Sequence, residues 1–255
     1  MSGETHEVHR HEAPTSFIRK YIFSLDHKVI GIQYIILALA AVLVGMTMSV
    51  LMRMNLSWPG TSWPILGTLF PSGAPGGIMN PEFYLSLVTM HGTIMVFFVL
   101  TTAPQGGFGN YFLPIQIGAE DMAFPFLNMM SFWVTLVGFI VILAAIFVEG
   151  NVTLANSAVG LALGGASGAT VGPIGGWTGY APLSAVGVAA GPGQGAGMNL
   201  WIVSIAIFCV GSLLGALNFI TTLLNMRTRG MTLMRMPLTC WAWFTTAVLA
   251  LLSFP

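Results

Sequence analysis

The sequence predicts an all-α integral membrane protein built as a bundle of transmembrane helices. Of its 255 residues, 55% are hydrophobic and only 6% are charged, whereas a soluble domain carries about 25% charged residues. The mean hydropathy is +0.84. Its apolar residues gather in long runs that lack the alternation of a β-barrel strand. Because a helix satisfies its own backbone hydrogen bonds in lipid, we expect these runs to be helical spans.

Two segments are expected, a cytoplasmic tail at residues 1–28 and a membrane domain at residues 29–255. The second span is long, and its GGFGN segment at 106–110 is expected to bend it. A glycine-rich outer insert, 150–197, separates the third and fourth spans. The predicted spans, in chain order, are 29–52, 84–117, 124–148, 198–225 and 236–255.

Basic residues predict the orientation. All Lys and Arg residues except Arg53 precede the first span or lie between the fourth and fifth spans. The positive-inside rule therefore predicts a cytoplasmic N-terminus. Because the formal net charge is zero, the composition gives no reason to expect a nucleic-acid partner.

His91 is the one histidine inside a predicted span. A histidine in hydrocarbon needs a partner and usually marks function. One interpretation is a hydrogen bond to a neighbouring helix, and the other is axial ligation of a haem iron or copper by neutral imidazole. The flanking residues favour haem, because Gly92 would leave room for a flat macrocycle. Met95, Phe97 and Phe98 would pack around it.

Arg53 lies at the outer end of the first span, at a level expected to be similar to that of His91. A cation there could bond a polar substituent on a haem edge and raise the reduction potential. The alternative interpretation is that Arg53 only extends its side chain to the membrane interface.

Asp121 lies in the loop on the inner side, between Asn110 and Asn128. A carboxylate at the mouth of a helix bundle, with amides leading inward, is what a proton uptake pathway needs. The alternative is a solvated loop acid accompanied by helix-capping asparagines.

Five strings in the chain together resemble subunit I of the haem–copper terminal oxidases, in the order and spacing of that family. They are DHKVIGIQY (26–34), MHGTIMVFF (90–98), GGFGNYFLPIQIGAEDMAFPFLN (106–128), GGWTGYAPLS (175–184) and LGALNFITTLLNMRTRGMTLMRMPLTCWAW (214–243). The resemblance implies a fold of about twelve spans, of which this chain offers about five.

By this resemblance, His91 looks like an axial iron ligand of the low-spin haem, which we expect to be of the haem A type. Arg53 looks like the arginine that contacts the periphery of this haem. Trp177 and Tyr180 look like outer residues near its propionates.

The resemblance also implies that Asp121 accepts protons from the inside, with Asn110 and Asn128 as the amides of the proton pathway. The family often has two adjacent asparagines where this chain has Asn128 followed by Met129. One pathway amide is therefore absent here.

The family takes electrons from cytochrome c or from a quinol. Quinol oxidases that resemble this chain carry Arg, Asp, His and Gln around the quinone. The corresponding residues here cannot replace those charges and hydrogen bonds, which favours cytochrome c delivering through a copper centre in subunit II. These residues are Val44, Met48, Phe83 and Ser86.

The resemblance implies a component of an oxygen-reducing enzyme in an energy-transducing membrane of the bacterial inner-membrane type. Its copper and second haem would need histidines, but His91 is the only histidine after His27. We therefore expect the N-terminal portion of subunit I, as a fragment, a split subunit or part of a longer chain. The remainder of subunit I, subunits II and III and the lipid bilayer are the expected partners.

Three other hypotheses remain at this point. A channel or transporter would carry no chromophore, and few charges are available to line its pore. A cofactor-free structural fragment would only scaffold the rest of the complex. A quinol-oxidising dihaem cytochrome is disfavoured because such bundles need several histidines within the membrane.

Overall fold

The computed structural model describes residues 16–150, 176–180 and 196–253, and it confirms the predicted all-α bundle. Four helical segments in this part of the chain are long and apolar enough to cross a membrane: His27–Ser57, Pro81–Ile117, Pro125–Val148 and Gly197–Asn225. The fifth predicted span appears as α9, Leu238–Ser253, which has 16 described residues. At 1.5 Å per residue it measures about 24 Å, less than the roughly 30 Å of a hydrocarbon core.

The complete helices extend slightly beyond these segments. They are α1 (His27–Ser57), α3 (Pro81–Thr93), η3 (Ile94–Gly109), α4 (Asn110–Ile117), α5 (Pro125–Gly150) and α8 (Ala196–Asn225). Short helices cap the bundle: η1 (Ile18–Ile22), α2 (Pro64–Leu69), η2 (Pro75–Gly77) and η5 (Leu233–Arg235).

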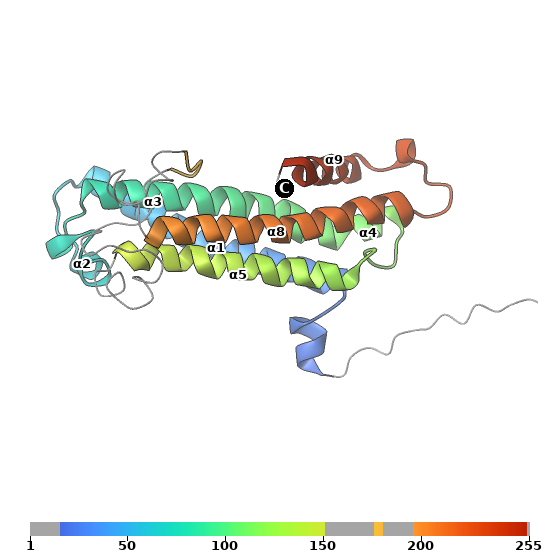
Figure 1. Cartoon of the computed structure of the whole chain (residues 1–255), viewed down its shortest axis with the longest axis horizontal. Helices are drawn as coiled ribbons and strands as arrows, with labels where there is room; N and C mark the ends of the chain where they lie inside the picture. The colour runs from blue at the N-terminus through green and yellow to red at the C-terminus, as the bar shows by residue number, and fades with distance from the viewer. Residues whose placement is uncertain (1–15, 151–175, 181–195, 254–255) are drawn as a thin grey trace, which may run out of the picture.

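The long helices run alternately in opposite directions (Figure 1). At one end of the bundle lie the start of α1, the loop between α4 and α5, and the connection from α8 to α9. We call it the basic end, because six of the described Lys and Arg residues belong to it: Arg19, Lys20, Lys28, Arg227, Arg229 and Arg235. Among the described residues, Arg53 is the one cation at the opposite end.

Helix α1 begins before the predicted span because Asp26 caps it. The Asp26 carboxylate accepts the Lys28 backbone N–H at 2.7 Å, as an N-cap residue does. His27 therefore lies in the first helical turn and is 3% exposed. This corrects the expectation that His91 is the one histidine within a span, although His27 lies at the basic end and His91 does not.

The middle of the second span is a π-helix, η3, which the sequence analysis did not predict. Long π-helices are rare, and this one contains Pro104, which lacks a backbone N–H. The glycines of its GGFGN segment allow close packing against α1. A Cβ on Gly31 would lie 2.9 Å from the Gly107 carbonyl oxygen, and one on Gly106 would lie 2.7 Å from the Tyr34 ring.

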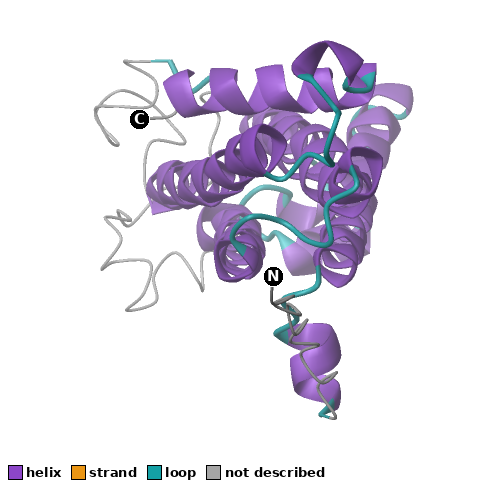
Figure 2. Cartoon of the chain, turned by 90° about the vertical axis from the view of Figure 1, so that its right-hand side faces the viewer, coloured by secondary structure: helices purple, strands orange, loops and turns teal. Residues whose placement is uncertain are grey.

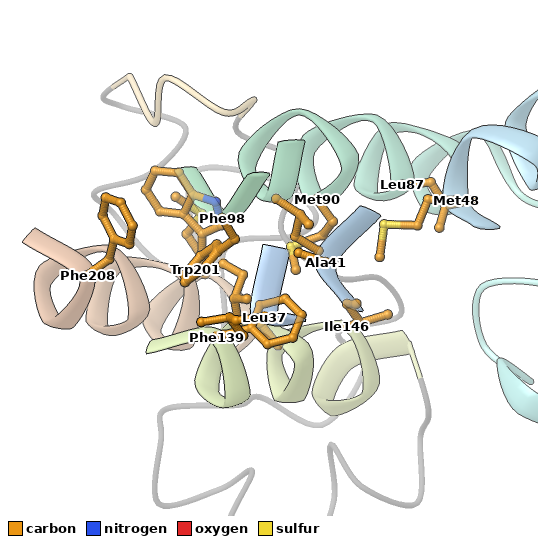
Figure 3. Packing of buried hydrophobic residues seen from close by; sticks show 14 of the residues in the cluster. Leu37, Ala41, Met48, Leu87, Met90, Phe98, Phe139, Ile146, Trp201 and Phe208 are labelled. Atoms are coloured by element: carbon orange, nitrogen blue, oxygen red, sulfur yellow. The ribbon is translucent and has the colours of Figure 1, made fainter. Parts of the chain in front are cut away.

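The main core joins α1, α3, η3, α5 and α8 (Figure 3). Phe98 of η3 contacts Phe139 of α5 and Phe208 of α8, with ring centroids 5.4 and 5.2 Å apart. Trp201 of α8 donates its Nε1–H to the Thr93 hydroxyl at 2.8 Å. This core fixes α3 against its neighbours and thereby sets the position of His91.

Candidate functional site

His91 lies near the end of α3 and is half-buried. Its Nδ1 lies 2.8 Å from the backbone carbonyl oxygen of Gly45 in α1. Because a carbonyl can only accept a hydrogen bond, Nδ1 carries the proton. In the neutral ring, Nε2 then has a free lone pair, which is the form that binds a metal. Histidine ligands are commonly oriented by this kind of contact to a backbone carbonyl.

Gly45 permits this contact. The role of this glycine was not predicted from the sequence. A Cβ at position 45 would lie 2.7 Å from Sδ of Met95 and 3.7 Å from Nδ1 of His91. The absence of a side chain lets Met95 and His91 both reach the α1 backbone. The available signal was an isolated glycine within an otherwise apolar helix, which often marks a close approach.

In this structure Trp177 packs beside Gly92, where the sequence predicts room for a macrocycle. A Cβ on Gly92 would lie 3.4 Å from Cβ and Cδ1 of Trp177, so the tryptophan side chain already covers this face of the helix. The same loop is held to α3 where the Gly176 N–H donates to the Thr89 hydroxyl at 3.2 Å. The contact brings Trp177, predicted to lie near the haem, to the residue that follows His91.

Along the axis of α1, Arg53 does not lie at the level of His91, as the sequence analysis expects, but further toward the end of the helix. It follows Gly45, the contact residue of His91, by eight positions on α1, which is about 12 Å along the helix axis. The Arg53 side chain is exposed. Tyr180 is also exposed, at 76%. Both therefore lie at the periphery of the site and not beside the imidazole.

Asp121 lies at the basic end, in the loop between α4 and α5. Its Oδ1 accepts the Met122 backbone N–H at 2.6 Å. Burial raises the pKa of the Asp121 carboxyl, the charge of Asp26 raises it further, and the Met122 N–H and His27 oppose the rise. The structure therefore places this acid next to the start of α1.

The two predicted pathway amides are both buried, with exposures of 2% for Asn110 and 0% for Asn128. Asn110 donates its Nδ2–H to the Gly106 carbonyl at 2.7 Å, and its own backbone carbonyl accepts from His27 Nδ1 at 2.9 Å. Asn110 Oδ1 and both side-chain polar atoms of Asn128 have no hydrogen-bond partner among the described residues. Buried amides of this kind are commonly satisfied by ordered water.

A cavity of about 290 Å³ is lined by Asn110 and by residues of α1, η3, α5, α8 and α9. Many of its lining residues carry a hydroxyl or an amide. The sequence alone did not reveal that these residues share one cavity. The signal was present as polar residues at helical spacing inside the apolar spans. These residues are Tyr34, Thr101, Thr102, Gln105, Ser131, Thr135, Ser212, Thr246 and Ser253.

Asn128 connects to this cavity through its backbone. Its carbonyl accepts from the Ser131 hydroxyl at 2.7 Å, and the Ser131 and Tyr34 hydroxyl oxygens lie 2.9 Å apart. Asn218 of α8 holds the neighbouring loop, because its Oδ1 accepts the Phe124 N–H at 2.9 Å. The predicted amides and the cavity thus form one polar region at the basic end.

Among the described residues, His91 would hold a haem iron through Nε2. The orientation of His91 leaves Nε2 available, and the second axial ligand would come from elsewhere. The described residues do not fit a copper centre, because no group of three or more His, Cys, Asp or Glu in the described ranges could hold a metal ion. The aromatic side chain of Trp177 lies beside Gly92, and the cation Arg53 follows Gly45 by eight positions toward the end opposite the basic end.

Comparison with known sequences places these residues in a family. The profile of cytochrome c and quinol oxidase polypeptide I matches residues 29–255. The chain is 42% identical over 242 residues to the alternative cytochrome c oxidase subunit 1 of Bradyrhizobium diazoefficiens, covering 95% of this chain and 35% of that protein.

Two further relatives, both cytochrome c oxidase subunit 1, are 38% identical. The match covers 94% of this chain and 38% of the Candida albicans protein. For the Synechocystis protein it covers 92% of this chain and 35% of the relative. The chain therefore spans little more than a third of the length of these relatives, in their N-terminal portion. It belongs to the cytochrome c and quinol oxidase polypeptide I family.

Proposed function

We propose that this chain supplies one axial ligand of a low-spin haem, and the first part of a proton uptake pathway, to a respiratory cytochrome c oxidase. The observation that carries the proposal is the hydrogen bond from His91 Nδ1 to the Gly45 carbonyl. It fixes the tautomer that leaves Nε2 free to bind iron. The hydrogen bond to α1 and iron binding at Nε2 use different ring nitrogens, so His91 can do both.

The side chains around His91 have separate roles in this proposal. When bound, the haem supplies one-electron chemistry, and we expect it to be of the haem A type. The imidazole of His91 holds its position through Gly45. Arg53 contributes positive charge toward the outer end, which favours the reduced state. Trp177 and Tyr180 form an aromatic and hydroxyl boundary on that side, near the propionates.

Asp121 is the proposed proton acceptor at the inner surface. Burial raises the pKa of its carboxyl, so it retains a proton to higher pH than an exposed aspartate does. Asn110 and Asn128 can order a water chain without storing charge, and the hydroxyl-rich cavity continues from Asn110. The direction of proton movement is from the basic end inward, and its coupling to translocation is part of the proposal.

Cytochrome c, acting through a copper centre in subunit II, is the proposed electron donor. Three of the four residues at the quinone positions are almost fully buried: Met48 at 5%, Phe83 at 1% and Ser86 at 2% exposure. They would present neither charge nor an accessible surface to a quinone. The two relatives named cytochrome c oxidase subunit 1 agree with this choice of donor.

The proposed setting is a bacterial inner-type membrane with the basic end at the cytoplasm, as the positive-inside rule favours. The second haem ligand, the copper and the binuclear haem would come from partner chains. The proposed partners are the remainder of subunit I, subunit II and subunit III. The proposal is tested by comparing reduced-minus-oxidised haem spectra of the assembled complex with and without His91. Loss of the low-spin band in the variant is expected, and an unchanged band would contradict the proposal.

A further inference from the structure

A groove of about 370 Å³ lies between α1 and α5 on the outer surface of the bundle. Its lining is apolar except for Gln33 at one end. The lining residues are Gln33, Ile36, Leu37, Ala40, Phe132, Leu136, Phe139, Ile140 and Leu143. Ile36 and Ile140 are 61% and 58% exposed, so the groove opens toward the surroundings of the bundle.

The groove has the length of one lipid leaflet. It extends over eight residues of α1, from Gln33 to Ala40, and over twelve residues of α5, from Phe132 to Leu143. These lengths are about 10 and 16 Å. Half of a hydrocarbon core is about 15 Å thick. An acyl chain of one leaflet would therefore match the groove.

The groove ends in a polar region formed by the last residues of η1 and by Phe23, which follows it. Gln33 donates its Nε2–H to the backbone carbonyls of Tyr21 and Ile22, at 2.6 and 2.9 Å. The Phe23 ring stacks on Trp133, beside the lining residue Phe132, at 4.9 Å. These contacts place the end of η1 across the basic end of the groove.

Helix η1 projects crosswise from the bundle where α1 begins, as Figures 1 and 2 show. It carries Arg19 and Lys20 in its last turn, both exposed, and exposed apolar residues including Phe17 and Ile18. A helix with this mixture lies in the membrane interface, with its cations at headgroup level. The two cations precede Tyr21, whose carbonyl binds Gln33 at the end of the groove, and Lys20 Nζ lies 5.2 Å from the centroid of the Tyr21 ring.

Two buried polar atoms near this end have no hydrogen-bond partner among the described residues, Gln33 Oε1 and Trp133 Nε1. We propose that the groove between α1 and α5 holds one acyl chain of an anionic phospholipid whose headgroup binds Arg19 and Lys20.

The test counts the phospholipids that stay with the purified full chain in mild detergent, by native mass spectrometry. The chain is first mixed with equal amounts of phosphatidylglycerol and phosphatidylcholine. We expect one retained phosphatidylglycerol per chain, preferred over phosphatidylcholine by about thirtyfold, the effect of two basic residues at a membrane surface. Equal retention of the two lipids would overturn the proposal.

Two variants, each compared with a matched control variant, separate the parts of the site. Ala40→Phe fills the groove and should abolish retention, whereas Leu39→Phe makes the same side chain at a neighbouring residue outside the groove and should retain the lipid. Arg19→Gln with Lys20→Gln should remove the preference for phosphatidylglycerol, and Arg229→Gln with Arg235→Gln should keep it. Because η1 lies outside the bundle, the Arg19 and Lys20 variant tests the proposal even if Ala40→Phe fails to fold.

Other outcomes also decide the matter. Undiminished retention in folded Ala40→Phe, or an unchanged preference without Arg19 and Lys20, would overturn the proposal. Release of the lipid when companion subunits assemble on the chain would identify a protein helix as the occupant, and would overturn it too. None of these results depends on haem, so the proposed oxidase function is tested separately.

Discussion

His91 and Gly45 meet across the contact between α3 and α1, with Nδ1 of the imidazole 2.8 Å from the carbonyl oxygen of the glycine. The pairing joins two residues that are 46 positions apart in the sequence. His91 donates the only N–H of its neutral ring. Gly45 accepts through its backbone carbonyl, and it has no side chain to cover that oxygen. The orientation of Nε2 therefore depends on the α1 backbone.

Gly45→Ala should disturb this orientation. The added methyl would lie 2.7 Å from Met95 Sδ, and overpacking of this kind costs about 1–3 kcal/mol. We expect a lower haem content per chain and a displaced low-spin band in the assembled complex. The double variant Gly45→Ala with Met95→Ala should recover both, because it removes the crowded thioether. Haem content and spectra identical to wild type in the single variant would show that Gly45 does not orient His91.

Asp121→Asn should slow proton uptake, by about a hundredfold if this carboxyl is the acid that takes up the proton. Uptake is measured by flow-flash absorbance of a pH dye in the reconstituted complex. The low-spin haem spectrum should stay intact, because Asp121 lies at the basic end and away from His91. Glu120→Gln, a change at the exposed neighbouring residue, is the control and should leave uptake unchanged. Loss of the spectrum in Asp121→Asn would instead assign Asp121 a structural role.

Asp26→Asn should lower the pKa of the Asp121 carboxyl. A nearby negative charge disfavours ionisation, so Asp26 raises this pKa and its neutralisation should move the titration midpoint to lower pH. Asparagine caps helices as well as aspartate does, so α1 should begin at the same residue. Infrared titration of the carboxyl band, assigned by its loss in Asp121→Asn, measures the midpoint. A midpoint that stays constant or rises would refute the coupling.

Arg53→Met should lower the haem reduction potential, because removal of a cation favours the more positive oxidised state. A redox titration of the low-spin band in the assembled complex gives the potential. Arg229→Met removes a cation from the basic end and should leave it unchanged. Since Arg53 lies about 12 Å beyond the level of Gly45, an unaltered potential in Arg53→Met would place this side chain outside electrostatic reach of the haem.

The fold class could be predicted from composition and periodicity, because a chain this apolar can satisfy its backbone in lipid only as helices. The predicted start of α1 was two residues too late. The charge of Asp26 is typical of a tail, but its side chain caps the helix. The π-helix η3 was not predictable from hydropathy. It contains Pro104, and its Gly107 packs closely against Gly31 of α1.

Candidate residues could be selected from the sequence where one unusual residue type stood in an apolar run, as for His91, Asn110 and Asn128, and their roles stay predictions. The candidate site was not predictable where tertiary contacts decide the environment. Gly92 is covered by Trp177, which comes from a loop 85 positions later in the chain. The hydroxyl-lined cavity needs six helical elements to assemble, and each of them contributes residues that look ordinary within a single helix.

The most direct test of the account is the reduced-minus-oxidised spectrum of the assembled complex carrying His91→Ala. The account predicts loss of the low-spin haem band with the companion subunits still assembled, since no other described histidine lies at that depth. His27→Gln changes the buried histidine at the basic end and should retain the band. A low-spin band of wild-type intensity in His91→Ala would contradict the central claim that this imidazole binds the haem iron.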